Sequence, residues 1–173
     1  MFENRLASER LHLIGGPARE EKPGGLGTVR FVAKCKGNAP EVLEKAKETL
    51  KAVNENSLPE WPSIDRWRQI LPAWFVNRCD PGRSQEEAEN WLTWWKSLTP
   101  AEQKKVLAEE EWSLEDWIYW FQPDNRQWYW WDGVPLDSNY VVIAVEVDAW
   151  PFAWGSLRWL FRAAGADDLR SEE

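Results

Sequence analysis

The side chain types that most often perform catalysis are scarce in this sequence. His12 is the only histidine, and no cysteine or carboxylate stands near it at the spacing of a metal-ligand set. Ser-His-Asp, Cys-His and histidine-zinc sites all need an imidazole, so each would have to be built around this residue. We therefore expect His12 to be an incidental surface or strand residue, and the chain not to be an enzyme.

Carboxylates are plentiful, and two of them in unequal environments can act as acid and base on a sugar. Most acidic clusters, such as Glu86-Glu87-Glu89, fall at the starts of predicted helices, where the helix dipole favours them. The run Glu109-Glu110-Glu111 lies instead near a predicted helix C-terminus, where the dipole disfavours negative charge. We expect this run to face a partner.

No metal or cofactor motif is present. Cys35 and Cys79 each lack a second cysteine at metal-ligand spacing, and Asp124, Asp132 and Asp137 do not match a calcium loop. Two distant cysteines in a chain of this size are typical of free, buried thiols. We predict no metal, no cofactor and a cytoplasmic protein.

Tryptophan is the most unusual feature of the composition, with 15 copies in 173 residues. Burying a large aromatic side chain removes roughly 150–250 Å² from water, so tryptophan first of all builds cores. On helical wheels six tryptophans share stripes with Leu, Ile and Phe and are predicted to be core: Trp67, Trp74, Trp91, Trp95, Trp117 and Trp154. Others leave these stripes or put aromatics on both faces of a strand, and we predict that they bind a partner: Trp94, Trp120, Trp128, Trp130 and Trp159.

The net charge of -8 limits the classes of partner that the protein can bind. Binding to nucleic acids requires Lys and Arg to neutralise phosphates, so this balance disfavours nucleic acids and favours basic proteins. The longest apolar stretches, residues 140–145 and 149–157, are too short to cross a bilayer, and residues 1–6 lack the pattern of an export signal. We expect no membrane association.

The first sixty residues predict an arm, a strand and a helix. Gly and Pro punctuate residues 15–27, which predicts a flexible N-terminal arm over residues 1–27. From Thr28 to Cys35 apolar residues alternate, as in a strand with one buried face. Asn38 and Glu41 form a capping-box pattern ahead of an amphipathic helix that ends near Asn54.

The middle of the chain, residues 61–122, predicts four short helices. Ser63, Ser84, Thr99 and Ser113 are their expected N-caps, and Pro72 should kink or interrupt the first. After Pro123 the apolar residues recur at every second position, which predicts a hairpin of strands 127–132 and 139–148. A last helix over residues 154–164, terminated by Gly165, precedes an acidic tail, residues 167–173.

This order predicts a single α+β domain over residues 28–166, with residues 61–122 as a tryptophan-rich four-helix insertion. It resembles a ferredoxin-like β-α-(helical insert)-β-β-α arrangement that has a small antiparallel or mixed sheet and lacks a last strand. The first strand should lie beside strand 139–148. Cross-strand charge pairs would then join Glu146 or Asp148 to a basic residue of the first strand, namely Arg30, Lys34 or Lys36.

Our first hypothesis is a non-catalytic protein-binding domain with a basic partner. Trp128, Trp130 and Trp159 would be its anchors, and residues 109–111 would steer the encounter. Bacterial immunity proteins, which block a toxic enzyme such as a nuclease, are similar in size and charge only. Two alternatives stay open: carbohydrate binding or hydrolysis that uses exposed tryptophans with Asp124 or Asp132, and a homodimer closed by the aromatic face.

Overall fold

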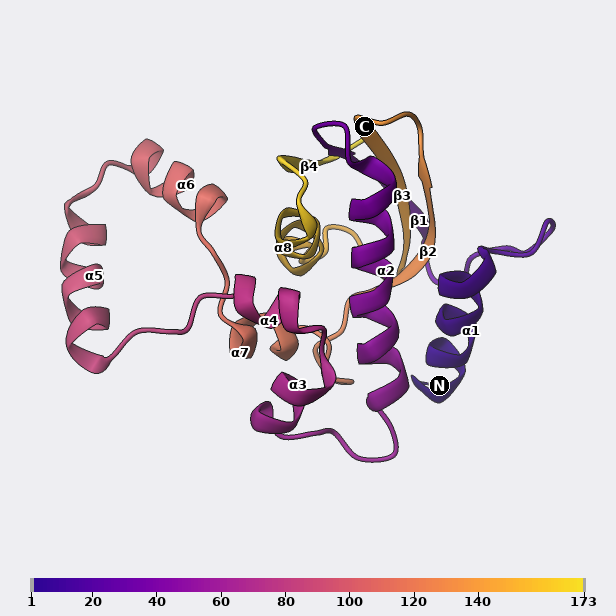
Figure 1. The fold of residues 1–173 in the computed structure, drawn as a ribbon, viewed down its shortest axis with the longest axis horizontal. Coiled ribbons are helices and arrows are strands. Elements are labelled where there is room, and N and C mark those ends of the chain that lie inside the picture. Colours follow the sequence, from indigo (N-terminus) through magenta and orange to yellow (C-terminus); the bar gives the residue numbers. More distant parts are fainter. Residues whose placement is uncertain (1, 173) are drawn as a thin grey trace.

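The computed structural model describes residues 2–172, which form a mixed α+β fold of eight helices and one four-stranded antiparallel sheet. The strands are ordered β2-β3-β1-β4, and helices α2 and α8 lie on one face of the sheet (Figure 1). The strands are β1 (Gly27–Lys34), β2 (Trp128–Pro135), β3 (Tyr140–Val147) and β4 (Asp168–Ser171). The helices are α1 (Phe2–Gly15), α2 (Ala39–Asn56), α3 (Ile64–Ile70), α4 (Ala73–Arg78), α5 (Gln85–Ser97), α6 (Pro100–Glu109), α7 (Leu114–Tyr119) and α8 (Gly155–Ala164).

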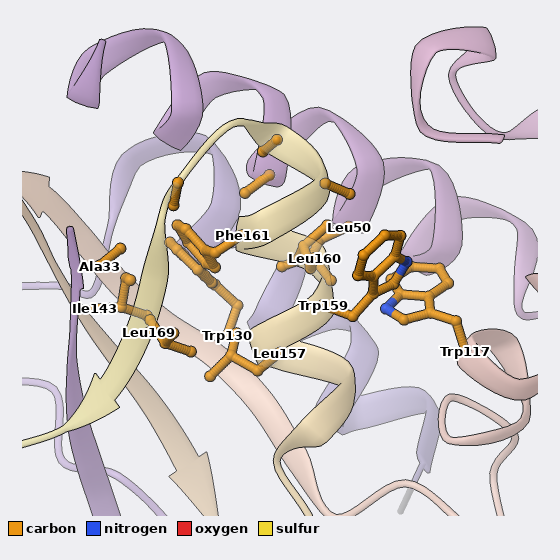
Figure 2. Close-up of a cluster of buried hydrophobic side chains, with 14 of the residues drawn as sticks. Ala33, Leu50, Trp117, Trp130, Ile143, Leu157, Trp159, Leu160, Phe161 and Leu169 are labelled. Carbon is orange, nitrogen blue, oxygen red and sulfur yellow. The ribbon is translucent and has the colours of Figure 1, made fainter. Parts of the chain in front are cut away.

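The core lies between the sheet and the helices α2 and α8. Alternate residues of β1 and β3, such as Phe31 and Ile143, point into it and are fully buried, as the period-two pattern predicts. From β2, the Trp130 ring stacks on Phe161 of α8 at 6.3 Å between centroids (Figure 2). A Cβ atom at Gly133 would stand only 2.5 Å from this indole, so glycine is required there.

The N-terminal segment that was expected to be flexible is instead largely a helix. Residues 2–15 form α1, which packs on β2 and α2, and only residues 16–26 are irregular. The buried positions of α1 mix Leu6 and Leu13 with the polar residues Glu9 and His12. Because half of its buried face is polar, the helix leaves no apolar stripe for a periodicity search to find.

Helix α1 packs on strand β2, and side chains of α1 and of Arg126 bind three backbone groups of that strand. The Glu9 carboxylate accepts from Trp130 N at 2.8 Å, and His12 Nδ1 lies 3.2 Å from Trp130 O. Arg126 donates to Trp128 O at 3.0 Å and forms an ion pair with Glu9, both side chains being 1% exposed. Polar side chains thus take the place of a neighbouring strand at Trp128 and Trp130.

Part of the acidic tail forms the last strand, which the predicted arrangement lacks. Residues 168–171 form β4, which pairs with residues 31–34 of β1 and buries Leu169. With one apolar residue in four, the segment is too short for a strand pattern to stand out. Asp168 is held by Arg158 at 2.9 Å.

Strand β1 does pair with β3, as predicted, but the charges do not pair across them. The register sets Thr28 opposite Glu146, so β1 has no basic residue there. Glu146 and Asp148 instead bind Arg5 of α1, at 3.1 Å and 2.8 Å. Two of the three predicted basic residues pair with carboxylates near β4: Arg30 lies 3.2 Å from Glu172, and Lys36 lies 3.5 Å from Asp167.

Residues 61–122 hold five helices rather than four, because Pro72 divides the first expected helix into α3 and α4. The four predicted N-caps are confirmed, since each hydroxyl accepts from a backbone N–H of the first turn. The capping box at Asn38 is not formed: its side chain accepts from Lys36 N at 3.0 Å instead. Over residues 2–172, no helix is long and apolar enough to cross a membrane.

Candidate functional site

The three predicted anchors are not available to a partner. Trp128, Trp130 and Trp159 are each 1% exposed and belong to the core. Trp128 donates from its indole to Ser156 Oγ at 3.1 Å, which fixes it against α8. Trp159 was predicted to be exposed because α8 was assumed to bury one stripe, but α8 packs against α2, α4 and β4 and is buried almost all round.

Two other helices contrast with this core. Helices α5 and α6 project from the body on two extended linkers, and we call them the arm, residues 85–109 (Figure 1). No residue of either helix is buried. Leu92, Trp94 and Leu107 are 45%, 47% and 56% exposed. A helix pair of this length normally hides an apolar stripe, so the arm is an unpartnered surface.

Trp91 and Trp95, predicted to be core, are only half-buried on the arm. Their rings stack on each other with centroids 5.2 Å apart. Trp94, one turn from Trp91, is exposed as expected and lies 6.3 Å from it between ring centroids. The three rings form one aromatic surface on α5.

The base of the arm is tied firmly to the body. Arg162 of α8 donates to the carbonyl oxygens of Ala108, Glu109 and Glu110 at 3.1–3.4 Å, which caps the C-terminal end of α6. A cation there complements the negative end of the helix dipole. The two linkers are joined by Asp80 N donating to Trp112 O at 2.9 Å.

Two hollows open at this base. The larger, of about 1480 Å³, lies between the arm and helices α4 and α7 and is lined in part by Val76, Asp80, Glu111, Trp112, Tyr119 and Trp120. The smaller, of about 330 Å³, is bordered by Trp91 and Trp94 and by residues 109–111. Five of the predicted site residues therefore gather here: Trp94, Trp120, Glu109, Glu110 and Glu111.

Negative charge is concentrated in the same region. Residues 80–120 contain ten acidic and four basic side chains, whereas the rest of the chain contains nineteen and seventeen. This segment thus holds -6 of the net charge of -8. One of its four basic groups is already engaged, because Arg83 lies 3.5 Å from Glu110 and 4.8 Å from the Trp91 ring centroid. The surface around the hollows is strongly electronegative.

His12 is neither on the surface nor in a strand. It is 5% exposed on α1, and its Nε2 lies 2.5 Å from Glu21 Oε2. The hydrogen bond to His12, and next the one to the Ala18 backbone, lower the pKa of Glu21. This pair ties the loop after α1 to the helix. Within residues 2–172 no three His, Cys, Asp or Glu side chains are grouped as a metal site.

Sequence reasoning missed Leu92, Leu107, Trp112 and Tyr119 as members of this surface. The clustering of acidic residues over 80–120 was a signal that could have marked the region as a unit. Asp124 and Asp132, considered for sugar binding, do not line either hollow.

Comparison with known proteins gives no relative to guide the interpretation of this surface. No protein-family model, no curated protein and no solved structure matches the chain. Its role must be inferred from the arm and the hollows themselves.

The buried thiol beside the larger hollow predicts a loss of stability at alkaline pH. Burial raises the pKa of Cys79 from 9.0 to about 11. The neutral thiol therefore stabilises the fold fully below pH 9, and this contribution is lost as the pH rises from 9 through 11. Over that window we expect this group to lower the free energy of unfolding by at most about 1.4 kcal/mol per pH unit.

Urea unfolding at pH 8 to 11 would measure this effect, with Cys79→Ala expected to flatten the decline. Cys35→Ala is the matched control, because the pKa of Cys35 is also raised by burial but less strongly. If the free energy of unfolding of Cys79→Ala fell with pH as steeply as that of the unmodified chain, Cys79 would not be the cause of the alkaline loss of stability.

Proposed function

We propose that this chain is a non-catalytic protein-binding domain whose partner is a basic protein. An immunity-type inhibitor of a basic toxin, such as a nuclease, is the class that fits its size and charge. One observation carries the proposal: the arm buries none of its residues although it holds Trp91, Trp94 and Trp95. A partner that covers the arm would give these side chains the burial that the isolated chain does not.

Exposed aromatic side chains on the arm support a protein interface. Trp and Tyr are enriched among the few residues that supply most of the binding energy, and such residues lie in desolvated pockets at the centre of an interface. Trp94, with Leu92 beside it on α5 and Leu107 on α6, offers large apolar side chains of this kind. The adjoining hollows provide concave surface into which a partner can pack.

Charge favours a basic partner over a second copy of this chain. Two copies that met through the arm and the surface at its base, residues 80–120, would each bring a net charge of -6, and like charges in contact oppose association. A positively charged partner would be attracted at long range, which speeds the encounter. The arm is thus better suited to a heteromeric complex than to a homodimer.

The arm is also held ready for binding. Arg162 and the bond between the linkers fix its base before any partner arrives. A surface that is already ordered loses less entropy on association, and so keeps more of its contact energy as affinity.

The proposal includes the finer description of the fold and the location. The strand order β2-β3-β1-β4, with α2 and α8 as the connecting helices, supports a ferredoxin-like arrangement in which residues 61–122 are a tryptophan-rich insertion. Cys35 and Cys79 are both free and buried, which supports a reducing, cytoplasmic location.

A position-specific crosslink tests the proposal. A photoreactive benzoylphenylalanine replaces Trp94 on the arm, or Leu136 in the matched control, and each full-length protein is irradiated in its native cells. Leu136 is 69% exposed but lies in the turn of the hairpin, away from the arm. We expect position 94, and not position 136, to capture one protein with an isoelectric point above 9.

The captured protein, once purified, should bind the unmodified chain in calorimetry, and the affinity should fall at least tenfold between 50 and 500 mM salt. Crosslinks of equal yield at both positions, no crosslink at 94, or an acidic captured protein would each overturn the proposal.

A further inference from the structure

We propose that the larger hollow receives an arginine-bearing segment of the basic partner, with the guanidinium against the aromatic wall and the hollow's carboxylates around it. This inference rests on the proposed function and specifies what the partner must carry. It follows from the size of the hollow, the pairing of its charges and the position of its aromatic rings.

The size of the hollow indicates a piece of a macromolecule. Pockets for small molecules usually enclose about 300–1,000 Å³, and this hollow, at about 1480 Å³, is larger. Its walls come from helices α4 and α7, both linkers and the base of the arm, so the hollow spans several elements of the chain. A loop or helix end of another protein fits such a space.

The unpaired carboxylates of the hollow favour the binding of a cation. Its two arginines already have carboxylate partners: Arg83 lies 3.5 Å from Glu110, and Arg68 lies 3.8 Å from Glu115. Among residues 2–172, Glu111 and Asp116 have no ion-pair partner. The hollow therefore keeps unpaired negative charge after its own basic groups are counted.

The aromatic wall favours arginine over lysine. Tyr119 is 49% exposed, and its ring meets Trp120 edge-on at 5.3 Å between centroids. Trp112 lies half-buried against Gly155, where an added Cβ would stand 2.8 Å from its ring, so the indole is fixed in place. A planar guanidinium stacks on such rings and also makes forked hydrogen bonds to carboxylates, which an ammonium cannot do.

A comparison of two oligopeptides tests the inference. Fluorescein-labelled nona-arginine and nona-lysine are titrated with the full chain in 50 mM salt, and the anisotropy is recorded. We expect nona-arginine to bind one-to-one and at least fivefold more tightly than nona-lysine. Tyr119→Ala should reduce that preference, and Tyr119→Phe should preserve it because the ring is kept.

Charge-matched variants locate the site. Glu111→Gln with Asp116→Asn should weaken nona-arginine binding at least tenfold. Glu48→Gln with Glu55→Gln, the same loss of charge on exposed positions of α2, should weaken it less than twofold. Circular dichroism confirms that both double variants are folded.

No binding of nona-arginine, equal binding of the two peptides, or equal weakening by the two double variants would overturn the inference. The proposed function is judged separately by the crosslink at position 94, which uses neither peptide. If that crosslink yields a basic partner whose affinity is unchanged by Glu111→Gln with Asp116→Asn, the arm is the interface and the inference about the hollow is wrong.

Discussion

Replacing Glu9 by glutamine is expected to lower the free energy of unfolding by about 3–5 kcal/mol, the cost of removing one partner of a buried ion pair. The substitution keeps the shape of the side chain and removes its charge. Arg126 would remain charged and buried, since its side chain is 1% exposed. It has no other carboxylate partner within residues 2–172, so the full cost of a buried charge would fall on the fold.

The effect is large because Glu9 joins three elements. Its carboxylate accepts from Trp130 N on β2 at 2.8 Å and from Asn54 Nδ2 on α2 at 2.9 Å, besides the ion pair with Arg126. Glutamine would turn one acceptor oxygen into a donor that faces other donors. A buried donor without a partner adds its own penalty.

Urea unfolding at pH 7 measures this loss, with Glu172→Gln as the control. Glu172 forms an exposed pair with Arg30, of which 46% and 60% of the side chains are accessible. Such pairs contribute about 0–1 kcal/mol, so the control should change stability little. Equal losses for Glu9→Gln and Glu172→Gln would show that the Glu9 pair is not the buried joint described above.

Replacing Trp130 by alanine should cost about 3–5 kcal/mol of stability, whereas Trp94→Ala should change it by less than about 0.5 kcal/mol. Trp130 is 1% exposed and fills the space between Phe161, Leu43 and Gly133, so truncation leaves a cavity in the core. Trp94 is 47% exposed on the arm and supports no core contact.

Thermal and urea unfolding of both variants check this prediction. For partner binding we expect the larger loss in Trp94→Ala. Trp94→Ala should abolish the crosslinked partner's binding while keeping full stability. A stability loss above about 2 kcal/mol in Trp94→Ala would mean that the arm is packed onto the body, which would contradict its description as unpartnered.

Much of the fold could be predicted where a local sequence pattern determines the structure. The alternation of β1, the hairpin, the N-cap hydroxyls and Gly165, with its φ of 118°, each depend on short-range rules and were confirmed. Helix α1 and strand β4 could not be predicted, because what holds them is tertiary. Glu9 and His12 bind a strand more than a hundred residues away, and β4 buries a single leucine.

The candidate site was predicted in part, and the error has one physical source. A helical wheel assumes that each helix has one buried side. Helix α8 is surrounded, so Trp159 off its stripe is still buried. Helix α5 buries no residue, so Trp91 and Trp95 on its stripe are only half-buried. The acidic run at 109–111 does follow the C-terminal end of α6 and borders the smaller hollow, and its role in facing a partner stays a prediction.

The side chains that bind the edge of β2 also affect how the chain behaves at high concentration. An open, apolar edge strand is a template on which further strands add, and such addition leads to aggregates. Strand β2 opens with Trp128-Tyr129-Trp130-Trp131, a segment that would be prone to it. Arg126, Glu9 and His12 occupy backbone groups of Trp128 and Trp130. A strand of a second molecule cannot pair with β2 at these positions, which protects the protein from aggregation.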